Sequence, residues 1–504
     1  MNKESMSPRE IKLVIGALMS SLLLAALDQT IVTTALPTIV SDLGSASKLS
    51  WVITAYLLSS TAVTPLYGKI GDLYGRKKIL LVAVFIFLLG SFLCGLANGI
   101  TMLIVARAIQ GLGAGGLFPL VLASIADFVP FKERAKYQSG FGIVFGLSSV
   151  VGPLLGGFLT ELISWRSVFY INLPVGAVAV YLISKYLHAS EESRKHKIDY
   201  LGAGLIASCI SAILLITVWG GKEYGWNSSV IVLLALYTVI SLLIFIYVEN
   251  KVEEPILPLT LFKNKTINYS LTLSALTGLT LFGTLVYISI YLQVVKGFSP
   301  TLSGISLLPL TFGIYPSSTY VGKSVGRDGR FKKFLVAGSI IMSLSLLCLT
   351  QLNYDTSYIV VALILFAVGL GLGCLIQLPI LIVTSVVNKS MIGVGSSTVT
   401  FFRSIGAAFG TALFGSLLNS RLAHYFNNIA GSQKMPEMDL NSFANIASLP
   451  ESFKIPVLNA FTQAEGDVFL AGFILSLLAI VVSIIIPNIN LHLSSQEIKN
   501  QPLE

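Results

Sequence analysis

Apolar residues in this chain are gathered into long runs that short polar segments separate. A helix needs about 20 apolar residues to cross a bilayer, and fourteen runs reach or approach this length. The predicted spans are residues 11–36, 49–68, 78–98, 101–125, 137–160, 166–187, 200–219, 229–248, 268–293, 302–322, 333–352, 357–385, 392–419 and 467–487. The pattern predicts an all-α integral membrane protein.

Composition supports the same class of protein. The 504 residues are 54% hydrophobic and 11% charged, with a mean hydropathy of +0.82, whereas soluble domains are about 25% charged. The first apolar run is too long for a cleavable signal peptide and lacks a small-residue cleavage site, so we expect it to stay as an anchor. The cysteines and histidines show no ligand spacing, so neither a metal site nor a disulfide framework is expected.

Positive charge is concentrated on one side of the predicted bundle. If the N-terminus is cytoplasmic, 24 Lys and Arg fall in cytoplasmic segments and 7 in outer loops. Cytoplasmic loops carry such an excess, so both termini are predicted to be cytoplasmic, in a multi-pass protein of the cell membrane. The net charge of +9 is then explained by topology and by contact with anionic lipid, and no nucleic-acid partner is expected.

Two cytoplasmic loops repeat each other. Residues 68–78 follow the second span and residues 322–332 follow the tenth, and each loop begins with Gly-Lys and reaches Gly-Arg seven and eight residues later. If the seventh and eighth spans are an insertion, the chain contains two parallel repeats of six helices. Such repeats are typical of transporters with a substrate site between the halves.

This interpretation divides the chain into three parts. We expect a first six-helix half at residues 1–190, two inserted helices at 191–262 and a second six-helix half at 263–504. The second half contains a long extracellular loop at 420–466, where apolar residues stand among polar ones. An amphipathic hairpin and an irregular loop both fit that segment.

Asp28 is the most informative residue of the first span. A charge at membrane depth costs roughly 3 kcal/mol on insertion scales, and no other carboxylate lies as deep in any predicted span. Asp28 and Arg107 lie about nine and six residues from the outer ends of the first and fourth spans. At a rise of about 1.5 Å per residue both side chains fall in the outer half, so we expect a buried ion pair.

That pair suggests a mechanism for proton coupling. A buried carboxylate is driven toward protonation without its partner and stays ionised beside an arginine. A conformational change that alters the contact between Asp28 and Arg107 would therefore load or release a proton. A static structural pair, or an Asp28 that only hydrogen-bonds the fourth span, is the alternative.

Several segments together resemble a known family. They are residues 27–37, 68–78, 107–113, 146, 152–157, 165–174 and 291–297. Their order and spacing resemble the fourteen-helix drug:proton antiporter branch of the major facilitator superfamily, the EmrB/QacA group. The resemblance implies the major facilitator fold, with two six-helix halves, two extra central helices and transport by alternating access.

The resemblance also implies roles for two motifs. The first is a cytoplasmic gate formed by Gly68, Asp72, Gly75 and Arg76, for which a solvated basic turn is the alternative. The second is a fifth-span antiporter motif that makes a flexing contact between the halves and favours exchange over symport. It comprises Gly146, Gly152, Pro153, Gly156 and Gly157. Plain packing of small residues is the alternative for this second motif.

Other positions add detail to these two motifs. Asp127, at the inner end of the fourth span, could join the gate, but an exposed charge at a helix end is the expected interpretation. The second-half loop has Gly326 where Asp72 stands, so a matching carboxylate contact is not expected there. The thirteenth span carries Arg403 and no acid, so the resemblance does not carry over a preference for divalent cations.

Amides and aromatic residues inside the spans are candidates for lining a large, mostly apolar cavity. They are Tyr56, Gln110, Phe145, Tyr287, Tyr291, Gln293, Gln377 and Arg403. Aromatic residues in membrane helices also face lipid or the protein core, which is the alternative. Arg403 could bind an anionic group, pair with an acid or extend toward the interface.

The sequence thus predicts a proton-driven exporter of lipophilic, often cationic compounds. No GxxxxGK[ST] motif for ATP occurs, so we expect the proton gradient as energy source, no cofactor and a functional monomer. One alternative is an exporter or symporter of an endogenous metabolite. Another is a non-transporting scaffold or a membrane-embedded enzyme, although no Ser/His/Asp, paired-carboxylate or metal cluster supports catalysis.

Overall fold

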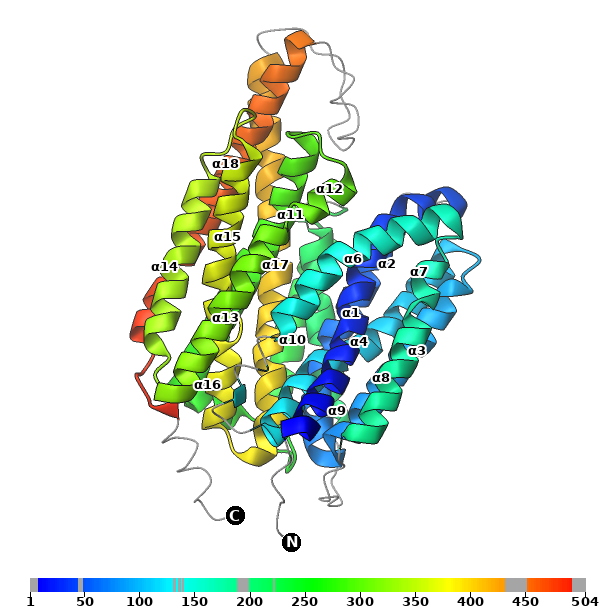
Figure 1. Ribbon diagram of the computed structural model, residues 1–504, viewed down its shortest axis with the longest axis vertical. Helices are drawn as coiled ribbons and strands as arrows, with labels where there is room; N and C mark the ends of the chain where they lie inside the picture. The colour runs from blue at the N-terminus through cyan, green and yellow to red at the C-terminus, as the bar shows by residue number, and fades with distance from the viewer. Residues whose placement is uncertain are drawn as a thin grey trace.

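The protein is a bundle of long α-helices (Figure 1). The computed structural model describes residues 8–43, 49–129, 133–134, 137, 140–187, 199–220, 223–430 and 451–491. The helices are α1 (Pro8–Leu43), α2 (Leu49–Tyr74), α3 (Arg76–Gly95), α4 (Ile100–Phe128), α6 (Gly140–Leu162), α7 (Ser167–Tyr170), α8 (Asn172–Tyr186), α9 (Tyr200–Trp219), α10 (Ser229–Glu249), α11 (Lys265–Val294), α12 (Pro300–Ile305), α13 (Leu308–Asp328), α14 (Lys332–Leu349), α15 (Tyr358–Leu375), α16 (Leu378–Val386), α17 (Ile392–Ala430) and α18 (Glu451–Ile485). The predicted all-helical class is confirmed.

Eleven helical segments in the described part of the chain are long and apolar enough to cross a membrane. They coincide with eleven of the predicted spans. α2, α6 and α13 coincide with the remaining three and are 26, 23 and 21 residues long, but they are not among the eleven. The count of fourteen spans therefore stays a prediction.

The helices form two groups that two further helices connect. In Figure 1, α1–α8, the first half, lie on the right, and α11–α18, the second half, lie on the left. α9 and α10 pack on each other, and α9 contacts α2 of the first half and α17 of the second. One apolar cluster includes residues of all three parts, among them Leu122, Ile210, Phe245 and Val399. The boundaries predicted near residues 190 and 262 stay predictions.

The ends of the helices define a lower and an upper end of the bundle in Figure 1. α1 begins and α18 ends at the lower end of Figure 1. The chain also descends to this end through α16, and α17 begins there. Ascending helices such as α14 end toward the upper end. The lower end and the upper end are used below in this sense.

The predicted loop at 420–466 is too long. α17 continues to Ala430 and α18 already begins at Glu451, so only residues 431–450 lie outside the described part of the chain. Val457, Phe461, Ala464 and Val468 are all buried, and their spacing of three or four residues is that of one helix face. Polar residues between them hid this periodicity from a search for continuous apolar runs.

Glycines bring the helices of the first half into backbone contact. A Cβ atom added to Gly90 of α3 would lie 2.4 Å from the backbone nitrogen of Gln110 in α4. A Cβ atom on Gly113 would lie 2.3 Å from the nitrogen of Phe87. Only a residue without a side chain permits this approach, which fixes the position of Gln110 against α3.

We expect Gly90→Ala to lower the melting temperature of the purified protein. The added methyl group would meet backbone atoms that cannot rotate away, and overpacking of a core costs about 1–3 kcal/mol. Gly16→Ala in α1 is the matched control, because nothing lies within 4 Å of its Cβ position. Thermal unfolding in detergent measures both variants, and equal melting temperatures would contradict the close packing of α3 on α4.

Candidate functional site

Asp28 lies near the middle of α1 and is fully buried. Its Oδ2 atom accepts a hydrogen bond from Nη1 of Arg107 in α4 at 2.7 Å, which makes a buried ion pair. Its Oδ1 atom accepts from Nε2 of Gln110 at 2.7 Å and from Nδ2 of Asn172 in α8 at 2.9 Å. The predicted ion pair is present, and three donors from two helices hold the carboxylate.

Arg107 has its own set of partners. Its Nη1 atom also donates to Oε1 of Gln110 at 2.6 Å, and its Nε atom donates to the carbonyl of Val52 at 3.2 Å. The guanidinium carbon lies 4.2 Å from the centre of the Tyr56 ring, a distance at which a cation and an aromatic face attract. The positive charge would thus keep three contacts if the charge of Asp28 were neutralised.

Ser91 and Asn172 were not predicted as site residues. The Ser91 hydroxyl oxygen accepts from Nε2 of Gln110 at 2.6 Å and from Nδ2 of Asn172 at 3.0 Å. Both side chains are fully buried, and Oδ1 of Asn172 has no hydrogen-bond partner in the described part of the chain. An amide inside the predicted span 166–187 was the available signal for Asn172, whereas nothing distinguished Ser91 from other serines in spans.

The fifth-span glycines press α6 against the segment of α1 that carries Asp28. A Cβ atom on Gly152 would lie 2.0 Å from Oγ1 of Thr30, and one on Gly156 would lie 2.0 Å from Oγ1 of Thr34. Oγ1 of Thr30 also donates to the carbonyl of Ser148 at 2.8 Å. The contact of these two glycines is therefore within the first half, and not between the halves as predicted, because the α1 threonines fill the space that the glycines leave.

The rest of this motif is less constrained. Nothing lies within 4 Å of a Cβ atom on Gly157. The surroundings of Gly146 and the side chain of Pro153 lie outside the described residues. α6 as a whole contacts α12 and α13 of the second half. A role of the motif in favouring exchange over symport stays a prediction.

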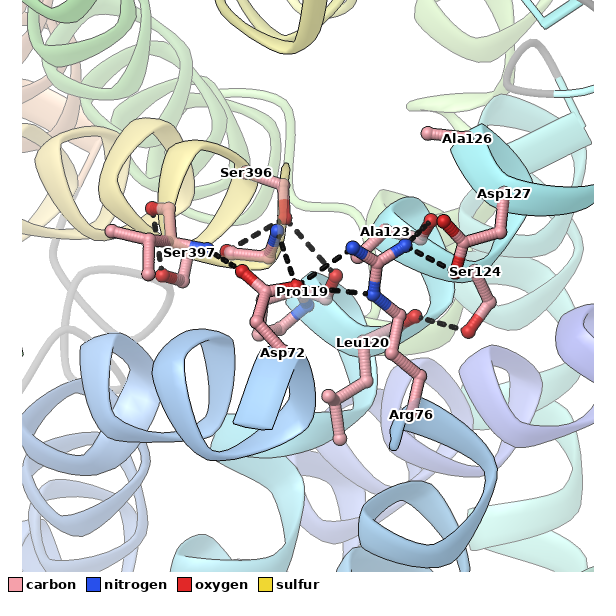
Figure 2. A network of polar contacts seen from close by, with 12 residues as sticks. Asp72, Arg76, Pro119, Leu120, Ala123, Ser124, Ala126, Asp127, Ser396 and Ser397 are labelled. Carbon is pink, nitrogen blue, oxygen red and sulfur yellow. Dashed lines mark hydrogen bonds and ion pairs between the residues drawn. The ribbon is translucent and has the colours of Figure 1, made fainter. Parts of the chain in front are cut away.

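At the lower end, Asp72 joins the two halves (Figure 2). Its Oδ1 accepts from the backbone nitrogen of Gly393 at 3.0 Å and its Oδ2 from that of Val394 at 2.9 Å. These nitrogens belong to the first turn of α17, where free N–H groups and the helix dipole favour a negative charge. A carboxylate of the first half thus caps a helix of the second.

Arg76 holds Asp72 in place from the start of α3. Its Nη2 atom donates to Oδ1 of Asp72 at 2.7 Å, and its Nη1 atom donates to the carbonyl of Ala123 at 2.6 Å. Arg76 also forms an ion pair with Asp127 (Figure 2). Asp127 is exposed near the end of α4, as expected, but it also pairs with Arg76, so the alternative that it joins this contact is confirmed.

Glycines allow this lower contact to form. Gly75 has a φ of 89°, in the left-handed region that favours glycine, and turns the chain between α2 and α3. A Cβ atom on Gly68 would lie 2.1 Å from Oγ of Ser397 and 2.5 Å from the carbonyl oxygen of Gly393. α2 and α17 therefore touch through their backbones, and the lower ends of the two halves are closed on each other.

The repeated loop of the second half differs as its sequence suggests. Gly326 replaces Asp72 there, and the nearest acid, Asp328, pairs with its exposed neighbour Arg327 at 2.7 Å. The lower contact is thus asymmetric, with the acid supplied by the first half.

Most of the predicted cavity residues are packed inside the protein. Tyr56 and Gln110 belong to the Asp28 network. The hydroxyls of Tyr287 and Tyr291 donate to backbone carbonyls of the second half, at 2.8 and 2.7 Å, and both rings are buried. In this conformation the head groups of Gln110, Tyr287 and Tyr291 have partners within a packed core, and the Tyr56 hydroxyl has none among the described residues. That these four residues line a cavity stays a prediction.

The remaining cavity residues have varied positions. Gln293 is exposed near the end of α11, Gln377 is buried in the break between α15 and α16, and Arg403 is half-buried in α17. The side chain of Phe145 lies outside the described residues. A pocket of about 280 Å³ is lined by Thr217, Gly220, Trp226, Ala412, Ser416, Asn419 and Ser420. None of the predicted cavity residues lines it.

Glu465 is a second fully buried carboxylate. It lies in α18, is 1% exposed, and neither carboxylate oxygen has a hydrogen-bond partner in the described structure. The last span was predicted to begin at residue 467, whereas the apolar segment of α18 already begins at Lys454, so Glu465 fell outside the predicted spans. Among the described residues, no group of three or more His, Cys, Asp or Glu is placed to hold a metal ion.

Comparison with known proteins agrees with this fold. The family model described as Major Facilitator Superfamily matches residues 18–411. An uncharacterised MFS-type transporter of Mycobacterium tuberculosis is 40% identical over 480 residues, which are 94% of this chain and 70% of the relative. Multidrug resistance protein 3 of Bacillus subtilis is 35% identical over 94% of this chain and 93% of its own length. 

A solved structure supports the same assignment at the level of the fold. The human organic anion transporter MFSD10 superposes with a TM-score of 0.62 at 15% identity, covering 94% of this chain and 100% of that one. With many apolar helices and transporter relatives over most of its length, the chain is a multi-pass membrane transporter rather than an enzyme. It belongs to the major facilitator superfamily.

Proposed function

We propose that this protein exports lipophilic, often cationic compounds across the cell membrane in exchange for protons. The observation that carries the proposal is the buried carboxylate of Asp28, which Arg107 and two amides hold in the middle of an apolar helix. A charge at that depth is a functional feature by default. The multidrug resistance protein of Bacillus subtilis, similar over most of both chains, supports the substrate class.

The orientation follows from the distribution of charge. We place the lower end of Figure 1 in the cytoplasm, because the loops at that end carry most of the Lys and Arg residues. The contact of Asp72 with α17 then lies at the cytoplasmic mouth and closes the path from the cytoplasm. Alternating access requires this contact to open when a substrate enters.

In this proposal, protonation of Asp28 drives the cycle by weakening its ion pair with Arg107. Removing the charge from one partner of a buried pair is strongly destabilising, by about 3–5 kcal/mol. A proton that binds Asp28 would therefore release α1 from α4, while Arg107 keeps its contacts with Gln110, Val52 and Tyr56.

A movement of α1 can be transmitted to the second half through α6. α1 is packed on α6 through Gly152 and Gly156, and α6 contacts α12 and α13. A shift of α1 would thus move the surface on which the two halves meet. We propose that the protein works in this way as a monomer, with the proton gradient as its energy source and without a cofactor.

Asp28→Asn is expected to abolish proton-driven transport. Asparagine keeps the size of the side chain but cannot take up and release a proton, so the cycle loses its coupling step. Ethidium accumulation in inverted vesicles under an imposed pH gradient should fall to the level of vesicles without the protein.

Asp42→Asn is the matched control on the same helix. Asp42 is exposed, and its carboxylate accepts hydrogen bonds from Trp165 and Arg166, which hold the pKa of Asp42 below its usual range. We expect near wild-type transport from this variant. Full proton-driven ethidium transport by Asp28→Asn would overturn the proposed coupling site.

Asp72→Asn is expected to open the cytoplasmic mouth. The substitution removes the negative charge at the start of α17 and beside Arg76. A loss of about 1–2 kcal/mol corresponds to a factor of roughly 5–30 in an equilibrium. A cysteine placed by Val394→Cys in a cysteine-free background should therefore react faster, by this factor, with a water-soluble maleimide added to inverted vesicles.

Asp328→Asn in the repeated loop serves as the control for this measurement. Asp328 pairs only with its exposed neighbour among the contacts described above, so labelling at position 394 should stay at the rate of the parent. Equal labelling rates in Asp72→Asn and its parent would contradict the role of Asp72 as a latch.

A further inference from the structure

Glu465 is a buried acid that the proposed mechanism does not use. It lies in α18 with Phe461 one turn before it and Phe469 one turn after it, and both rings are fully buried. Neither of its oxygens has a hydrogen-bond partner among the described residues. An isolated ionised carboxylate is strongly disfavoured in such surroundings, and a neutral carboxylic acid is not.

Lys296, the cation that follows α11, already has a hydrogen-bond partner other than Glu465. Tyr291 of α11 is close enough to Glu465 to interact with it electrostatically, but its hydroxyl donates to the carbonyl of Asn353. Lys296 follows in the turn after α11, and its ammonium group donates to the carbonyl of Tyr354. α11 thus brings polar groups near Glu465 without supplying a counter-charge.

The other elements packed on α18 are α14 and α17. Arg421 and Tyr425 of α17 both contact Asp467 of α18, at 3.3 and 2.9 Å, and His424 packs its ring on Tyr425. The loop after α14 contributes Asp355, an acid. Each of these groups is either occupied elsewhere or of the wrong sign to balance a carboxylate at position 465.

Glu465 lies in the segment of α18 that is long and apolar enough to cross a membrane. The apolar segment of this helix runs from Lys454 to Ile485. A Cβ atom on Gly466 would lie 3.1 Å from the carbonyl oxygen of Thr350, the residue that ends α14. Glu465 is thus near the upper end of the second half, whereas Asp28 lies in the first half.

We propose that Glu465 is a second proton-binding site of this transporter, located in the second half. Its carboxyl group carries a proton in the arrangement described here, and it gives that proton to a water molecule, as hydronium, when α18 separates from α11. This proposal rests on the proposed function. It adds that each half holds one titrating carboxylate.

The surroundings of the two carboxylates are opposite in this conformation. Three donors surround the carboxylate of Asp28, whereas no donor among the described residues meets the oxygens of Glu465, which favours its neutral form. α17 connects the region of Glu465 to the latch, since it contacts α18 through Arg421 and Tyr425 and begins at the Asp72 contact. Opening the lower end therefore moves α17 against the helix that carries Glu465.

The proton on Glu465 can be measured without any transport. A protonated carboxyl group has an infrared C=O stretch that disappears on ionisation. We expect purified protein at neutral pH to show this band, Glu465→Gln to lose it and Asp28→Asn to keep it. A spectrum of wild type without the band, or one in which Glu465→Gln leaves it unchanged, overturns the protonation state. This result stands whether or not the protein transports dyes.

The role in transport needs a second measurement on reconstituted protein. Glutamine resembles the protonated acid in size and polarity, so Glu465→Gln should fold and transport ethidium, with a loss of protons exchanged per dye molecule. Asp467→Asn, two residues along the same helix, is the matched control and should keep the wild-type ratio.

These outcomes are separable from the failure of the proposed function. If wild type exchanges no protons for ethidium, the proposed function fails while the infrared band still tests the proton site. If wild type does exchange them and Glu465→Gln keeps the same ratio, then Glu465 is a static buried acid and the proposal is overturned.

Discussion

A charge placed in an apolar helix must be matched by groups from its neighbours, and the first half of this protein is arranged around that requirement. Asp28 draws Arg107 and Gln110 from α4 and Asn172 from α8. Gly90 lets α3 lie on the backbone of α4 at Gln110, which brings Ser91 within hydrogen-bond distance of the Gln110 amide. The helices approach closely only where glycines stand, and the buried carboxylate is tolerated only where neighbouring helices approach it. Packing and electrostatics therefore depend on each other in this half.

The same requirement is met at the lower end by different means. In the described part of the second half, the partners of Asp72 are the free N–H groups that begin α17, and no cation pairs with it there. A helix end offers a partner that separates cleanly, since water can replace the carboxylate on those N–H groups. Arg76 and Asp127 stay behind in the first half as a pair. The contact is thus suited to repeated opening, whereas the ion pair of Asp28 is closed off from water.

The sequence predicts the first half better than the second. Helix positions, the pairing of Asp28 with Arg107 and the glycine-rich loop all follow from apolar runs and local spacing. The contacts of Tyr56 and Gln110 with Arg107 and Asp28 could not be predicted, because sequence spacing does not show which face of a helix meets a neighbour. Glu465 was missed since helix α18 extends beyond its continuous apolar run. Asn172 and Ser91 depend on contacts between helices far apart in the chain, which a single sequence does not contain.

The hydrogen bonds around Asp28 have a direction. Every neighbour points an N–H group at the carboxylate, so an arriving proton meets donors on both oxygens. Arginine has no acceptor to offer, but an amide can exchange its NH₂ for its carbonyl by turning over. Asn172 already holds a carbonyl oxygen with no partner among the described residues. If Asp28 takes up a proton, the added O–H group needs an acceptor, and an Asn172 amide that turns over would present one.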